Sequence, residues 1–194
     1  TIFGVEGTKN PATVSFLAPS YNEEKEVNEV RKKAMEVIAF MNEELQKYIP
    51  NGVGRFDDGF NINCIGDTVQ NMGIPTVLIE AGHYPNDYER EETRKFIFIA
   101  LLSGLYNLNT NNSETKYLEY FNIPNNLMFF FDFLYKNIKF NYDNKQIITN
   151  FAVQFSERVE NQKVLFEAYI KEVGELQGFA GYFEFNAKEE SYSD

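Results

Sequence analysis

The sequence is poor in residues that bind metals or form disulfides. Its 194 residues include one histidine, His83, one cysteine, Cys64, and no tryptophan. A single cysteine excludes an internal disulfide and any cysteine-rich zinc site. Because Cys64 lies among apolar neighbours, Ile62 and Ile65, we expect a buried inert thiol, with a nucleophilic thiol as the alternative.

Basic residues and long apolar runs are also scarce. The chain has 18 Lys and Arg against 29 Asp and Glu, a net charge of -11. Nucleic-acid binding needs clustered Lys and Arg to neutralise phosphates, so no nucleic-acid partner is expected. No apolar run approaches the length of a membrane span, so no membrane partner is expected either. The chain opens on Thr1 instead of Met, which favours a piece of a longer or processed protein and leaves the compartment undefined.

The first part of the chain has an α/β pattern. Residues 12–18 are typical of a strand, and apolar residues at three- and four-residue spacing predict an amphipathic helix over 27–45. Residues 52–72 are polar and rich in glycine, which fits a loop that shapes a pocket or a turn-rich connection. The apolar run 73–79 then predicts a strand buried on both faces, ending at Glu80.

A second helix is expected after this strand, with Asn86 as its N-cap and Glu89 closing a capping box. Its apolar run 96–102 is hydrophobic nearly all round, which predicts burial against a sheet. Another helical segment is expected after Pro124. Its apolar side would carry Leu127, Phe130, Phe131 and Leu134.

The pattern changes near Phe140. Residues 146–155, 163–170 and 182–185 alternate like strands, and Val159-Glu-Asn-Gln162 would form a hairpin turn. The chain is therefore predicted to consist of an α/β part, residues 1–139, and a β-rich extension with an acidic tail, residues 140–194.

Glu80 is the main candidate for catalysis. Ligands of open α/β sheets bind at the carboxyl ends of strands, and a desolvated carboxylate is unusually basic, which suits a general base. The alternative is a strand-end Glu that caps the backbone or meets solvent. His83 is open to three interpretations: metal ligand, pocket-lining residue beside Glu80, or structural histidine. Asp67 could face a substrate pocket or cap the turn beside Gly66.

Four motifs resemble the bacterial branch of the M14 family of zinc carboxypeptidases: Arg55-Phe-Asp-Asp-Gly-Phe60, Gly66-Asp67-Thr68, Ile79-Glu-Ala-Gly-His83 and Arg90-Glu-Glu-Thr-Arg94. The order of elements over residues 1–107 also resembles the second half of that catalytic domain. The resemblance implies an α/β fold, part of a mixed-sheet α/β/α sandwich, with a small β-rich C-terminal extension. It also implies that Glu80 is the general base, with Asp67, His83, Tyr84 and Arg55 as candidates for the substrate pocket.

The same resemblance places the zinc ligands elsewhere. The family's His-x-x-Glu pair, its third histidine and the residues that hold the substrate carboxylate would all lie upstream of this chain. The family's mobile tyrosine would fall near Gly59 and Phe60, where there is no tyrosine. Zinc is therefore expected in the full-length parent, and no metal ligand or cofactor is expected in this chain, because a catalytic site needs three protein ligands.

The expected function is hydrolysis of the C-terminal peptide bond of a peptide by the full-length parent, with the isolated chain inactive. A deacylase of N-acyl amino acids on the same fold and an inert binding fragment remain alternatives. The expected partners are the substrate and the upstream half of the same catalytic domain. Since a divided sheet has an exposed edge, a homodimer through that edge is also expected.

Overall fold

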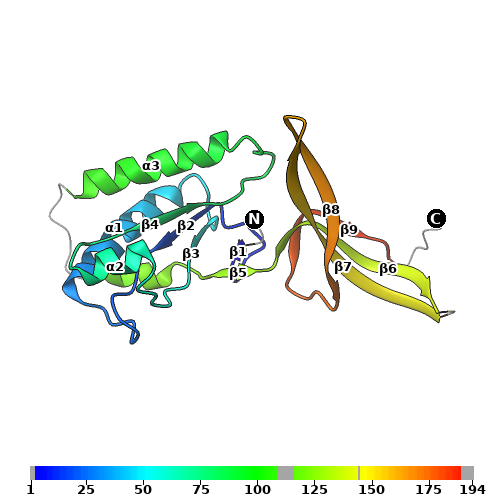
Figure 1. Ribbon diagram of the computed structural model, residues 1–194, viewed down its shortest axis with the longest axis horizontal. Helices are drawn as coiled ribbons and strands as arrows, with labels where there is room; N and C mark the ends of the chain where they lie inside the picture. The colour runs from blue at the N-terminus through cyan, green and yellow to red at the C-terminus, as the bar shows by residue number, and fades with distance from the viewer. Residues whose placement is uncertain (1–2, 109–115, 144, 189–194) are drawn as a thin grey trace. The chain divides into compact units, whose positions relative to one another are not determined.

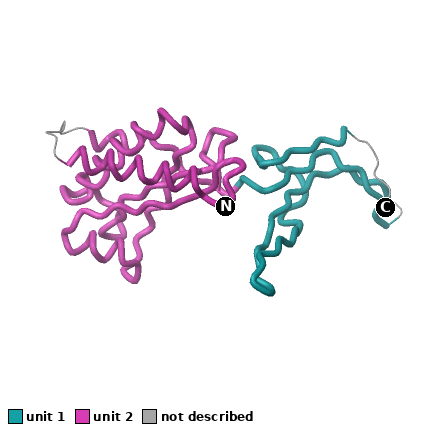
Figure 2. Tube along the Cα trace, turned by 90° about the horizontal axis from the view of Figure 1, so that it is seen from above, with its two compact units in different colours: residues 1–2, 129–194 teal, residues 3–128 magenta. Residues whose placement is uncertain are grey.

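Helices and a mixed sheet make up the first part of the chain, and long strands make up the second, in the computed structural model (Figure 1). The structure describes residues 3–108, 116–143 and 145–188. These form two compact units, divided between Met128 and Phe129 (Figure 2). The general α/β class is therefore as expected, while residues 129–139 group with the β-rich unit.

The central sheet of the first unit has the order β3-β2-β4. β2 (Val14–Leu17) lies in the middle, parallel to β3 (Val53–Arg55) and antiparallel to β4 (Leu78–Ala81). The strand expected over 12–18 is thus confirmed. The register places Phe16 beside Ile79 on one face and Ser15 beside Glu80 on the other.

Two antiparallel helices cover the face of the sheet that carries Phe16 (Figure 1). α1 (Glu29–Leu45) has the predicted apolar stripe and begins at Asn28, whose side chain accepts a hydrogen bond from the N–H of Arg31. α3 (Glu91–Asn107) packs on α1, on β2 and on β4. The core between them includes Val14, Met35, Ile38, Leu45, Phe96 and Ala100.

The polar stretch 52–72 is more regular than expected. It contains β3 and a short helix, α2 (Ile65–Asn71). Cys64 immediately precedes α2 and is exposed, so the expectation of a buried thiol was wrong. Its apolar neighbours explain the error, since Ile62 and Ile65 are themselves 53% and 82% exposed.

The start of α3 also differs from the prediction. Asn86 has a left-handed backbone (φ 59°), the N-cap position is Arg90, and the side chain that satisfies the first N–H groups of the helix is that of Asp87. The Asp87 carboxylate accepts hydrogen bonds from the N–H of Glu92, 3.1 Å, and from the N–H and hydroxyl of Thr93, 2.8 and 3.0 Å. Burial alone would raise the pKa of Asp87, but these hydrogen bonds outweigh it and hold the pKa below its usual value.

One side of α3 is uncovered within the described part of the unit. Thr93, Phe96 and Ala100 are buried against α1 and the sheet. The opposite side carries large apolar residues that are 45–61% exposed: Phe98, Leu101, Leu102 and Leu105. The predicted burial of the run 96–102 against a sheet therefore holds for its inner side, with Phe96 and Ala100, and not for its outer side.

Two short elements close the first unit. η1 (Lys116–Asn122) packs on α1, and β1 (Phe3–Val5) pairs with β5 (Asn126–Met128) in a two-stranded antiparallel sheet. No helix in the described ranges is long and apolar enough to cross a membrane.

The second unit is a four-stranded sheet of order β8-β7-β6-β9. Its strands are β6 (Phe130–Tyr142), β7 (Lys145–Glu160), β8 (Lys163–Gly174) and β9 (Ala180–Asn186). The three strands expected after Phe140 are confirmed, with the hairpin turn at Asn161 and Gln162. The helix expected after Pro124 was wrong, because that segment forms β5 and the start of β6.

Candidate functional site

Glu80 lies on an exposed edge strand. β4 pairs only with β2 among the described strands, and the Glu80 side chain shares a face with Ser15, away from the helices. Glu80 is exposed and Leu78 is 37% exposed, so the prediction of a strand buried on both faces was wrong. The carboxylate is therefore presented to solvent from a regular strand.

The chain immediately after Glu80 is fixed by close packing and hydrogen bonds. The N–H of Gly82 donates to the carbonyl of Thr13, 2.9 Å, and a Cβ at Gly82 would lie 1.8 Å from the carbonyl oxygen of Ala12. Only glycine fits this approach. Arg90 Nη1 then donates to the carbonyls of Ala81 and Gly82, 2.9 and 2.7 Å. Arg90 was not among the predicted site residues, although it opens one of the motifs that carry the resemblance.

A polar group lies next to Glu80 on the same face of the sheet. Asn126 Nδ2 donates to Ser15 Oγ, 2.9 Å, and Ser15 is the direct partner of Glu80 across the strands. Asn126 Oδ1 is buried and has no hydrogen-bond partner within the described residues. Gly54 accommodates this side chain, since a Cβ there would lie 1.8 Å from Asn126 Oδ1. No local sequence pattern marks Asn126, which comes from a strand distant in the sequence.

His83 and Tyr84 lie beyond Glu80, where the chain leaves the sheet. The carbonyl of His83 accepts a hydrogen bond from Thr13 Oγ1, 2.8 Å. Burial, helped by the positive charge of Arg90, lowers the pKa of His83 to about 4. Tyr84 packs edge-on against Phe96 in the core, with ring centroids 5.2 Å apart. It also lines a cavity of about 200 Å³ that Glu80 and His83 do not line.

Arg55 and Asp67 are engaged elsewhere. The Arg55 guanidinium donates to Asn125 Oδ1, 3.0 and 3.3 Å, and lies over the Tyr120 ring. The register puts Arg55 on the face of the sheet opposite Glu80. Asp67 is buried, and its Oδ2 accepts a hydrogen bond from the N–H of Asn61, 2.8 Å, which is the turn-capping alternative. Among the described residues, Arg55 and Asp67 therefore do not form the expected substrate pocket with Glu80.

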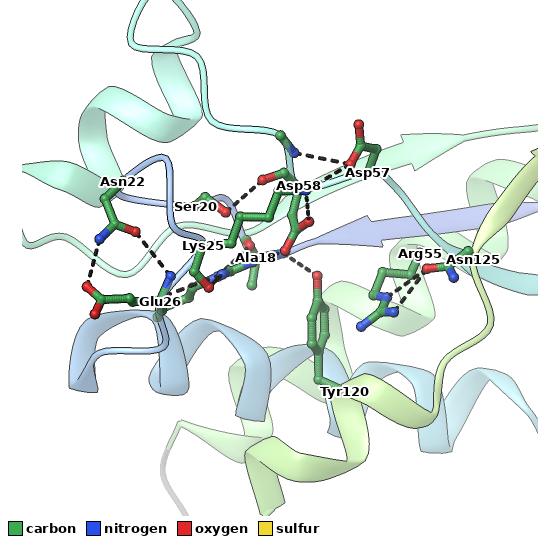
Figure 3. Close-up of polar contacts among 12 residues, drawn as sticks. Ala18, Ser20, Asn22, Lys25, Glu26, Arg55, Asp57, Asp58, Tyr120 and Asn125 are labelled. Carbon is green, nitrogen blue, oxygen red and sulfur yellow. Dashed lines mark hydrogen bonds and ion pairs between the residues drawn. The ribbon is translucent and has the colours of Figure 1, made fainter.

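The strongest ionic cluster of the first unit lies after β2 and β3 (Figure 3). Arg31 is 1% exposed and donates to Asp58 Oδ2, 2.6 Å, and to the carbonyls of Ala18 and Lys25, 3.1 and 2.7 Å. Lys25 Nζ lies 2.9 Å from Asp58 Oδ1. Burial alone would raise the pKa of Asp58, but the hydrogen bonds from Arg31 and Lys25 keep it below its usual value. These groups satisfy one another, so we interpret the cluster as an anchor between α1 and the loop after β3.

The described residues do not fit a catalytic zinc site. No group of three or more His, Cys, Asp or Glu within the described ranges is placed to hold a metal ion. His83 is the only histidine of the whole chain. Catalytic zinc requires three protein ligands and an open position.

Known proteins do not identify the chain. No protein-family model matches it, and neither a curated protein nor a solved structure matches it. Its function is therefore inferred from its own residues and their geometry.

Proposed function

We propose that this chain is the C-terminal part of the catalytic domain of a carboxypeptidase-type hydrolase, with Glu80 as the general base. The observation that carries the proposal is the exposed Glu80 carboxylate, presented from a strand whose end is fixed by Gly82 and Arg90. In amide hydrolysis, Glu80 would accept a proton from the attacking water and pass it to the leaving amine. A fixed backbone suits this role because proton transfer depends on hydrogen-bond geometry.

The uncovered surfaces of the first unit support a larger parent domain. β4 has one unpaired edge within the described sheet, and the Glu80 side chain on its outward face is exposed. The outer side of α3 is apolar and exposed, as are Met72 and Ile74, at 70% and 53%. Open edges and large apolar patches are normally covered in a complete domain. An upstream half that adds strands beside β4 and helices on both faces would complete an α/β/α sandwich.

Zinc is part of the proposed function only because the sequence motifs resemble those of zinc carboxypeptidases. It would supply Lewis-acid chemistry in the complete parent, held by ligands upstream of this chain. No step at the metal is derived from the residues present, because they do not fit such a site. The clamp for a substrate carboxylate would also be upstream, since Arg55 is bound to Asn125 on the opposite face of the sheet.

The proposed substrate is the C-terminal amide bond of a peptide. An N-acyl amino acid, cleaved by deacylases of the same fold, would use the same base. The two substrates differ in whether an arginine binds a free C-terminal carboxylate. Activity of the parent on peptides with free and with amidated C-termini separates them.

Replacement of Glu80 by Gln tests the assignment of the base in the longer protein that the proposal requires. We expect E80Q to retain bound zinc and the fold but to lose on the order of 100-fold or more in kcat, because glutamine cannot accept the proton. E89Q is the matched control, since Glu89 is also an exposed carboxylate in the segment after β4. The assignment fails if E80Q keeps most of its turnover, or if E89Q loses as much.

The isolated chain provides a second test. After dialysis, metal analysis should find far less than one zinc per chain, because the ligands would be upstream. One tightly held zinc per chain would overturn the proposed division of the site.

A further inference from the structure

The sheet of the second unit has one face on which aromatic and aliphatic side chains predominate. Residues paired directly across strands share a face, which connects Phe133 with Val153 and with Phe183. Ring contacts support the grouping, for example Phe133 with Phe155 at 5.3 Å. We call this surface the aromatic face. It comprises Phe133, Tyr135, Phe151, Val153, Phe155, Phe166, Ala168, Ile170, Val173, Phe183 and Phe185, and the carboxylate of Glu157 lies beside Phe166 on the same face.

The opposite face is polar and partly covered. Near the base of β6 and β7, Leu134 and Ala152 are buried with Leu176 and Phe179 from the connection between β8 and β9. Away from that cluster the face carries Tyr169 and Leu165 together with polar pairs. These are Lys136 with Glu184, Gln154 with Asp132, and Arg158 with Glu167. This face is therefore the one that we expect to be exposed to solvent.

The aromatic face leaves a large apolar area exposed. Ile170 is 59%, Val173 62% and Phe183 63% exposed, and Phe166 and Phe185 are 46% and 43% exposed. With about 200 Å² for a large apolar side chain, these five residues expose roughly 500 Å². That area is near the upper end for the largest apolar patch of a monomer. A sheet with one apolar face normally buries it against a second layer.

We propose that a second copy of this chain supplies that layer, with the two aromatic faces packed against each other about a two-fold axis. Two such faces would bury about 1,000 Å² in total, which is the area needed for a specific interface. Two identical sheets have the same twist and can therefore pack in the aligned manner of a β-sandwich. Glu157, the cross-strand partner of Phe166, is a charged residue on this face. The other residues that define the aromatic face carry no charge, so the contact brings few like charges together although each chain carries -11.

The geometry favours the face of this sheet over its outer edge. β8 is an edge strand, but its pairing with β7 is irregular: Ile170 pairs with Val153, and the next pair is Glu172 with Ala152. Lys171 is thus the extra residue of a β-bulge. Bulges and edge lysines oppose the addition of another strand. This proposed dimer is distinct from the homodimer expected from the sequence, which would pair the open edge of the divided α/β sheet.

The ring geometry favours a protein over a sugar as the occupant. Rings on neighbouring strands are stacked on each other, Phe133 with Phe183 at 24° and Tyr135 with Phe151 at 22°. Stacked rings present their edges, whereas a sugar binds on an open ring face. Tyr135 has the only hydroxyl on the aromatic face, so hydrogen bonds to sugar hydroxyls would be few. An interdigitated apolar contact fits these rings better.

Two adjacent residues of β8 give a matched test. Ile170 is on the aromatic face, and Tyr169, opposite Gln154, is on the polar face, 43% exposed. We expect the unmodified chain to show twice its 22.5 kDa mass by light scattering at tens of micromolar. I170K should raise the dimer dissociation constant by more than about 100-fold, because it buries an unpaired charge. Y169K changes the charge equally and should leave the dimer intact.

A second variant, F183E, places a charge on β9 and should also give monomers. Circular dichroism checks that each variant is folded. The proposal is overturned if the unmodified chain is monomeric, in which case another protein covers the face. It is also overturned if I170K and F183E stay dimeric while folded, or if Y169K dissociates as they do. None of these results depends on catalysis or on zinc, so they leave the assignment of Glu80 untouched.

Discussion

His83 shows how burial sets the charge of a single residue. Its pKa is lowered to about 4 from 6.5, chiefly by burial, and the positive charge of Arg90 contributes in the same direction. The folded chain therefore keeps His83 neutral between these values, while the unfolded chain takes up a proton as the pH falls below 6.5. The free energy of unfolding should therefore decrease as the pH is lowered from about 6.5 to about 4. H83Q should reduce this pH dependence.

NMR measures this directly, because the chain has one histidine and its ring signals need no assignment. We expect a titration midpoint near pH 4 in the folded chain. A midpoint near 6.5 would mean that the imidazole is hydrated and that burial does not lower its pKa.

Single residues are also where the sequence was least informative. Arg31 looks like any charged residue of a helix, yet it is buried and paired with Asp58, 27 positions away. Asp67 was open to two interpretations, and its hydrogen bond to Asn61 supports the turn cap. Partners far apart in the sequence leave no local pattern, so neither the anchor at Arg31 nor the contact of Asn126 with Ser15 could be predicted.

The hairpin between β7 and β8 carries a local strain that can be relieved. Asn161 and Gln162 both have positive φ, 50° and 62°, as a two-residue type I′ turn requires. Asparagine tolerates this conformation, whereas glutamine does not favour it. We expect Q162G to raise the free energy of unfolding by about 1 kcal/mol.

The control for this substitution is K163G, which places glycine in β8 one residue later. It should lower stability by a similar amount, because glycine weakens a strand. Denaturant unfolding measures both changes. If Q162G were destabilising, the assigned turn conformation would be wrong.

Helices and strands whose apolar residues recur at a regular spacing were predicted well. Segments that are apolar at nearly every position were not. The spacing of apolar residues located α1, and alternation located β7, β8 and β9. The run Phe129–Phe133 fits a helix or a strand equally, and pairing with β7 and β9 decides for a strand. For α3 the sequence identified an apolar helix but not its environment. Which side of a helix is covered depends on neighbours that a local pattern does not contain.

At the scale of the whole molecule, two units carry separate uncovered surfaces. The first has the β4 edge and the outer side of α3, and the second has the aromatic face. We assign different occupants to them, an upstream half of the catalytic domain and a second copy. The two assignments are independent, because residues of each surface can be changed without touching the other unit.

The outer side of α3 tests the first assignment. Phe98 and Leu105 are 61% and 60% exposed in this chain. The double variant F98K/L105K should therefore change the free energy of unfolding of the 194-residue chain by no more than about 0.5 kcal/mol. In the longer protein that the proposed function requires, the same substitutions would bury two charges under the upstream half and cost about 3 kcal/mol or more.

A100K is the control, because Ala100 is fully buried on the inner side of α3 and a lysine there should destabilise both proteins. Thermal and denaturant unfolding of the two proteins compare the effects. An equal, small effect of F98K/L105K in both proteins would mean that α3 keeps an exposed outer side in the parent. The first unit would then be a self-sufficient domain, and the case for a divided α/β/α sandwich would rest on the β4 edge alone.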